Sequence, residues 1–237
     1  MKKFELTTEF ITTFLGIKLF RIKALVEFGD VEKGELGGFV EKEENLEHYG
    51  NAWVYGDARV FGNAQVSGDA KVRGKADVYG CARVSGNAEV SGNVLVTGYA
   101  RVSRNADVFG NARVYENAQV SGRAKVFGDA AVFGDAEVFG NAVVYGDTDV
   151  SGNAMVSGNQ MYATVKGFGS EYRNTTFFVT KDGNVCVNCG CFSGTLEQFR
   201  EKVKETHKDT EYAKEYLVIA DLMEMHFKEE LEKIKKQ

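Results

Sequence analysis

Three histidines are the residues of this chain best suited to acid–base or metal chemistry, and they are His48, His207 and His226. A histidine can serve as the general base of an acyl transfer, and three together can hold zinc. His48 replaces a valine at the irregular start of a repeat, where we interpret it as a cap residue. His207 ends a predicted helix, where a cation favours the helix dipole, and His226 borders an apolar helical stripe. Each position has a structural explanation, so the sequence predicts no catalytic residue and no bound cofactor.

The cysteines are Cys81, which is isolated, and the C-x₂-C-x-C cluster Cys186, Cys189 and Cys191. The cluster lacks the fourth ligand of a structural zinc site, so no metal site is predicted. Cys191 precedes a predicted helix start, a position that lowers a thiol pKa and offers free amides to an anion. One interpretation is an ordinary glycine-containing cap loop, and the other is an anion pocket. The residues assigned to this predicted anion pocket are Ser170, Arg173, Lys181, Cys191, Ser193, Gly194 and Thr195.

The element that dominates the chain is a repeat of six residues, V-x-G-[N/D]-A-x. Valines recur every sixth position without interruption from Val54 to Val156. A short strict period means that each unit buries its apolar face only by stacking on the next. Alanine and valine two residues apart point to the same side of a strand, and glycine turns the corner. The sequence predicts about seven triangular coils of a parallel β-helix, with the repeat starting at Leu36.

Every third hexad falls on the same face of such a prism, and the residue after each valine separates the three faces. Serine recurs on one face, and aromatic residues recur on the other two. Because the inward sites are already filled, we expect these rings on the outside, where they either stack between coils or meet sister subunits. The second interpretation is favoured. The predicted oligomer interface consists of Tyr55, Phe61, Tyr79, Phe109, Tyr115, Phe127, Phe133 and Tyr145.

The ends of the chain differ from the repeat. Residues 1–35 are predicted as an N-terminal β cap, with a strand over 18–24 and a partner near 4–14. Residues 36–161 form the repeat. Residues 162–237 are predicted as a small α+β domain, with a hairpin around Asp182 and Gly183, an N-cap at Thr195, and helices to about 207 and from about 211 to 236.

Composition limits the classes of partner. The 237-residue chain has a formal net charge of −5, no proline and 27 glycines. This charge gives no general attraction to nucleic acid or to anionic lipid. The N-terminus has no clean apolar stretch typical of a signal peptide, and no run is long enough to span a bilayer. We therefore expect a cytoplasmic protein that binds neither nucleic acid nor membrane.

The repeat resembles the hexapeptide repeat of left-handed parallel β-helix proteins, many of which are acyltransferases. Four stretches near the two ends of the chain carry a second resemblance: Leu19-Phe20-Arg21-Ile22-Lys23-Ala24-Leu25, Gly37-Gly38-Phe39-Val40-Glu41-Lys42-Glu43-Glu44-Asn45-Leu46, Cys189-Gly190-Cys191-Phe192-Ser193-Gly194-Thr195-Leu196 and Tyr212-Ala213-Lys214-Glu215-Tyr216. They are similar to hexapeptide-repeat proteins of phages and prophages, which are often labelled transferases from the repeat alone. The resemblance implies a mainly β fold, a left-handed triangular helix and a trimer with parallel axes.

Three hypotheses about function follow. The first is a non-enzymatic trimeric binding protein of phage type that sequesters or inhibits a host factor or a small anionic, nucleotide-like defence signal. The second is an acyltransferase that acts at a cleft between subunits. The third is a structural spacer or virion component. The first is favoured because no catalytic group accompanies the extended aromatic surface.

Overall fold

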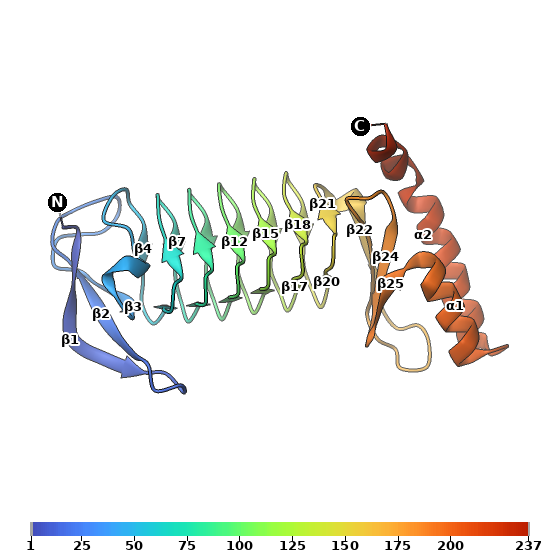
Figure 1. The fold of residues 1–237 in the computed structure, drawn as a ribbon, viewed down its shortest axis with the longest axis horizontal. Helices are drawn as coiled ribbons and strands as arrows, with labels where there is room; N and C mark the ends of the chain where they lie inside the picture. The colour runs from blue at the N-terminus through green and yellow to red at the C-terminus, as the bar shows by residue number, and fades with distance from the viewer. Residues whose placement is uncertain (1, 237) are drawn as a thin grey trace.

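A β-hairpin opens the chain and continues into the first coil of the repeat. The computed structural model describes residues 2–236. β1 (Phe4–Thr12) and β2 (Lys18–Ala24) pair antiparallel, and Gly16 turns between them with φ +79°. β2 also pairs antiparallel with β3 (Leu36–Val40), and β3 pairs parallel with β5 (Arg59–Val60). The predicted strands near 4–14 and over 18–24 are therefore confirmed, and Figure 1 shows the hairpin projecting beyond the prism.

The repeat folds as a three-sided parallel β-solenoid, which confirms the predicted mainly β class and the count of about seven coils. Every strand of the regular coils is short, and from β4 onward successive strands of one face are 18 residues apart. Face I contains β3, β5, β8 (Asp77–Val78), β11 (Leu95–Val96), β14 (Arg113–Val114), β17 (Ala131–Val132) and β20 (Asp149–Val150). Face II contains β4 (Trp53–Val54), β7 (Lys71–Val72), β10 (Glu89–Val90), β13 (Asp107–Val108), β16 (Lys125–Val126) and β19 (Val143–Val144). Face III contains β6 (Gln65–Val66), β9 (Arg83–Val84), β12 (Arg101–Val102), β15 (Gln119–Val120), β18 (Glu137–Val138) and β21 (Met155–Val156).

Valine and alanine fill the interior of the prism as expected. Val114 and Ala118 are both fully buried, and the same is true of nearly every repeat of the motif. The backbone bonds of one coil reach the next, for example from the Arg59 amide to the Ala76 carbonyl at 2.9 Å. At the corners glycine adopts a left-handed φ, and only Arg104 (φ 63°) and Glu116 (φ 59°) replace it within the regular block. The left-handed sense of the coil stays a prediction.

The first coil differs from the predicted phase. Val40 faces Val60 and Leu46 faces Val66, so both partners are 20 residues apart, whereas Val54 faces Val72 at the regular 18. Two extra residues therefore lie between Leu46 and Val54, and Leu46, not His48, occupies the valine site. A 3₁₀ turn, η1 (Glu43–Asn45), precedes this point. The expectation that His48 replaces a valine is wrong because the six-residue phase shifts here.

The C-terminal part closes the other end of the prism. A second 3₁₀ turn, η2 (Asn159–Met161), leads into an antiparallel sheet of β22 (Tyr162–Val165), β23 (Thr175–Val179), β24 (Val185–Cys189) and β25 (Phe192–Thr195). The sheet is bound to the last coils, where the Asn188 side-chain amide donates to the Asp149 carbonyl at 3.0 Å. α1 (Leu196–His207) and α2 (Glu211–Lys235) cover the sheet on its outer side (Figure 1). The predicted hairpin, N-cap and helices are confirmed, whereas β22 and β25 had not been predicted.

The narrow interior predicts a test of core packing. We expect Ala118→Leu to lower the free energy of unfolding by about 1–3 kcal/mol, because a larger side chain overfills a closely packed core. Gln119→Leu is the matched control, since Gln119 is the next residue and its side chain is exposed. Chemical denaturation of both variants measures the difference. Equal stabilities would contradict the assignment of Ala118 to the interior.

Two corner glycines provide a second test. Gly134 and Gly146 both have φ near +70°, but a Cβ at Gly134 would lie 2.7 Å from the Gly152 amide nitrogen, whereas one at Gly146 meets nothing within 4 Å. We expect Gly146→Ala to cost about 1 kcal/mol through the left-handed backbone alone. Gly134→Ala should cost clearly more, because the next coil must also shift. Thermal unfolding compares the two, and the reverse order would contradict the stacking at this corner.

Candidate functional site

The outward aromatic residues form stacked ladders along two faces of the prism. On face II, Phe127 stacks with Phe109 at 4.7 Å and with Tyr145 at 5.5 Å between ring centroids. On face I, Tyr115 stacks with Phe133 at 4.9 Å and Phe61 with Tyr79 at 4.8 Å. These rings are nearly parallel because equivalent residues of successive coils stand directly above one another. Ladder stacking within the chain, the simpler of the two expectations, is therefore present.

The rings at the N-terminal end are engaged by the chain itself. Phe61 is only 6% exposed, because Leu19 and Phe39 pack beside it on the outer side of face I. The Tyr55 hydroxyl donates to Asp30 at 2.7 Å, and the Arg73 guanidinium lies 4.2 Å from the Tyr55 ring. Burial and this carboxylate raise the pKa of Tyr55. These predicted interface residues, and Phe61 above all, leave little surface for a partner.

The rings of the middle and C-terminal coils remain uncovered. Phe109, Tyr115, Phe127 and Phe133 are half-buried by their ladder neighbours, and Tyr145 is 56% exposed. Figure 1 shows no segment of the described chain over these coils, since the hairpin lies at one end and the helices at the other. These five residues are the part of the predicted interface that stays available to a partner. Whether copies of the chain meet there stays a prediction.

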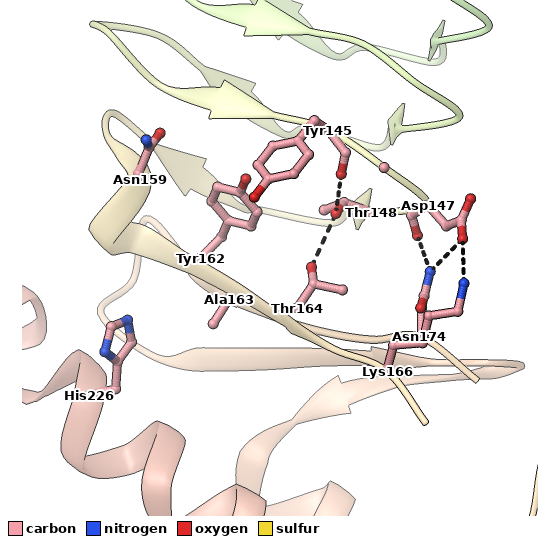
Figure 2. Close-up of a pocket in the computed structure, with 11 residues that line it drawn as sticks. Tyr145, Asp147, Thr148, Asn159, Tyr162, Ala163, Thr164, Lys166, Asn174 and His226 are labelled. Atoms are coloured by element: carbon pink, nitrogen blue, oxygen red, sulfur yellow. Dashed lines mark hydrogen bonds and ion pairs between the residues drawn. The ribbon is translucent and has the colours of Figure 1, made fainter. Parts of the chain in front are cut away.

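The face II ladder runs into a hollow where the prism meets β22. The hollow has a volume of about 610 Å³, within the usual size range of small-molecule sites. Figure 2 shows the Tyr145 and Tyr162 rings side by side on its wall. The Tyr162 hydroxyl donates to the Val143 carbonyl at 2.6 Å, and burial raises the pKa of Tyr162 to about 12. The Tyr162 side chain is therefore neutral at physiological pH, and its hydrogen bond holds it in place in the wall of the hollow.

The other end of this junction hollow is polar. Asp147 accepts hydrogen bonds from Lys166 at 3.2 Å and from Asn174 at 3.0 Å, and these bonds lower the pKa of the Asp147 carboxyl. The Asn174 side-chain oxygen is buried and has no hydrogen-bond partner among the described residues. Exposed His226 of α2 lies across β22 from these groups (Figure 2). The arrangement can hold a small polar molecule, but it aligns no nucleophile with a base.

The residues of the predicted anion pocket separate into two groups. Ser170, Arg173 and Cys191 line one hollow of about 270 Å³ beside α1 and α2, together with Lys202, His207 and Tyr216. Sequence reasoning had missed these helical residues, although Phe199, Lys202, Val203 and Thr206 share one face of α1 by their spacing of three or four. Each cation of this hollow has a carboxylate nearby: Arg173 faces Glu171 at 3.5 Å, and Lys202 faces Glu205 at 2.8 Å.

The remaining predicted residues lie elsewhere. Lys181 donates to the Asp135 carbonyl and pairs with Glu137 on face III, each at 2.9 Å. Ser193 and Gly194 belong to β25 rather than to a loop, and Ser193 lines a neighbouring depression. Thr195 and Gln198 bond each other's backbone amides in a capping box. The expectation of free amides at this helix start is therefore wrong for Thr195 and Gln198, because side chains of the cap already satisfy both.

Cys189 and His48 have structural partners, and Cys186 is partly buried. Cys189 accepts a hydrogen bond from the Thr175 hydroxyl at 3.2 Å, and burial raises the pKa of the Cys186 thiol. Burial, with the Cys189 thiol beside it, raises the pKa of Tyr216 to about 12. His48 stacks on Phe4 at 4.4 Å and accepts from the Lys3 amide at 3.2 Å. Over residues 2–236, no cluster of metal-binding side chains occurs.

Comparison with known proteins supports the repeat architecture. A family model described as the YdcK beta solenoid repeat matches residues 52–68 and 106–122, both inside the prism. A search of curated proteins found no match. Neither helix of the described chain is apolar enough over a sufficient length to cross a bilayer. The chain is a β-solenoid repeat protein.

Proposed function

We propose that this protein is a non-enzymatic binding protein that assembles with copies of itself, as a homotrimer, through the aromatic ladders of faces I and II. The observation that carries the proposal is the uncovered set Phe109, Phe127 and Tyr145 on one face and Tyr115 and Phe133 on another. Monomeric proteins rarely expose contiguous apolar strips of this kind. Aromatic residues are also the type most enriched at the centre of protein interfaces.

The difference between the faces supports a ring rather than a two-fold dimer. Faces I and II both carry aromatic residues but differ in their other outward side chains. A contact of face I with face II of the next copy is heterologous. Such contacts form a closed ring when the rotations between successive copies add up to a full turn. Face III, with Ser67, Ser85, Ser103 and Ser121 at the equivalent positions, would then remain in water.

The role that fits this assembly is binding a ligand rather than catalysing its reaction. In the phage-type role expected from the resemblance, the assembly sequesters or inhibits a host factor or a small anionic, nucleotide-like signal in the host cytoplasm. The junction hollow at the end of the face II ladder would lie beside the contact between subunits, so a ligand there could bridge two copies. Acyl transfer at that contact is the competing function, and it would require His226 as the base.

The subunit number tests the assembly. We expect the purified chain to be a trimer at micromolar concentration by analytical ultracentrifugation or native mass spectrometry. Phe127→Ser should dissociate it, because this substitution removes the central ring of the face II ladder. Phe139→Ser is the matched control: Phe139 holds the same position of the hexad on face III, and we expect this variant to stay trimeric. A monomeric wild-type chain would refute the proposal.

The same samples test the competing enzyme. We expect calorimetric titration with coenzyme A to give no binding, and His226→Ala to leave the subunit number and the thermal stability unchanged because the side chain is exposed. Coenzyme A binding that is lost in His226→Ala would favour the acyltransferase instead.

A further inference from the structure

Charges on the prism follow the coil stack, and face III differs from the other two faces in having like charges with no opposite charge beside them. On face I, Arg59 faces Asp77 in register and forms an ion pair with it. On face II the run is Lys71, Glu89, Asp107 and Lys125, so the two acids face each other but each has a lysine on its other side. On face III, Arg83 faces Arg101 directly, with Gln65 and Gln119 as the flanking residues. Two like charges stand opposite each other without an acid in register.

Such a pair is unfavourable by itself. Like charges directly opposite in a sheet destabilise it. Among residues 2–236, no carboxylate forms an ion pair with either arginine, although the same chain pairs Arg59 with Asp77 and Lys181 with Glu137. The next charge along this face is Glu137, beyond Gln119, and it is occupied by Lys181. Arg83 and Arg101 therefore lie opposite each other in register, and neither forms an ion pair with a carboxylate of the described chain.

The two arginines also line a hollow. Its volume is about 360 Å³, and the lining residues are Asn63, Gln65, Cys81, Arg83, Tyr99 and Arg101. Asn63, Cys81 and Tyr99 belong to successive coils at the corner between faces I and III. Tyr99 is 67% exposed, so its ring is free to stack on a ligand. At the end of the hollow away from Tyr99, Gln65 and Asn63 add neutral hydrogen-bond donors and acceptors.

We propose that this face III hollow binds a small phosphate ester that carries an aromatic ring. Adjacent parallel strands are about 4.8 Å apart, so two planar guanidinium forks can each donate to different oxygens of one phosphate dianion. The dianion cancels both charges at once. The Tyr99 ring supplies a stacking surface for the planar group. The proposal rests on the proposed binding function, and it assigns the anionic ligand to the face III hollow rather than to the junction hollow.

The extent of the charged patch favours a small ligand over a nucleic-acid strand. In register, the arginines occupy two coils, with glutamines on both sides and Glu137 farther along. A polyanion needs a longer continuous positive track. Arg104 and Arg123 on the neighbouring corner between faces III and II form no ion pair among the described residues, and they add to the local positive potential. The junction hollow and the hollow beside α1 and α2 are weaker candidates, because their cations Lys166, Arg173 and Lys202 already have acidic neighbours.

Calorimetric titration of the full chain at low salt tests the proposal with three probes: inorganic phosphate, AMP and adenosine. We expect phosphate to bind, AMP to bind at least about tenfold more tightly, and adenosine to bind more weakly than AMP. Arg83→Gln and Arg101→Gln should each weaken AMP binding about tenfold or more, because each removes a charge-assisted contact. Tyr99→Leu should reduce AMP affinity to that of phosphate.

Arg113→Gln is the matched control, since Arg113 holds the same position of the hexad on face I and faces Leu95 and Ala131. We expect it to leave AMP binding unchanged. Arg83→Gln should keep or raise the melting temperature without ligand, because it removes a like-charge contact, so lost binding cannot be attributed to unfolding. Absence of binding by phosphate and AMP, an equal loss in Arg113→Gln, or equal affinities for adenosine and AMP would overturn the proposal. Subunit number measured on the same samples reports separately on the assembly through faces I and II.

Discussion

The parallel ladder of backbone hydrogen bonds between coils is the constraint on which the rest of this structure depends. It places each residue of the regular coils directly over the one 18 positions later, and nearly all inward sites of the narrow interior hold valine or alanine. Each outward side chain therefore lies beside the side chain at the same position of the hexad in the next coil. Aromatic rings stack on one another in this arrangement, and side-chain amides such as those of Asn87 and Asn105 form a hydrogen bond at 3.0 Å. Like charges at equivalent positions destabilise the sheet.

An end of such a stack exposes unpaired strands, and the two ends of this chain are closed differently. At the start, antiparallel β2 and β1 extend face I, and a coil lengthened by two residues brings Trp53 under Phe4 and Phe28. At the other end, the four-stranded sheet and two helices cover the last coils. Both closures remove the open edges through which parallel stacks would otherwise associate without limit.

The three faces of the prism then differ in what they offer to other molecules. Faces I and II combine balanced charges with aromatic ladders, which suits contact with another protein surface. Face III combines serines, glutamines and an uncompensated arginine pair, which suits a small anion in water. A division of this kind would allow the proposed assembly through two faces to leave the third face available for a ligand.

Much of this was determined by the sequence itself, because a six-residue period is a local property that fixes which side chains point inward and which share a face. The valine register, the partition of aromatic and serine faces, the hairpin at Gly183 and the cap at Thr195 all follow from neighbours in the chain. Only the tertiary structure decided the phase shift at Leu46, the burial of Phe61 by Leu19 and Phe39, and the separation of Lys181 from Arg173. These depend on contacts between segments far apart in the chain, which no local spacing encodes. The pairing of Arg83 with Arg101 lies between the two cases: the period places them together, but only the folded surface shows that no carboxylate reaches them.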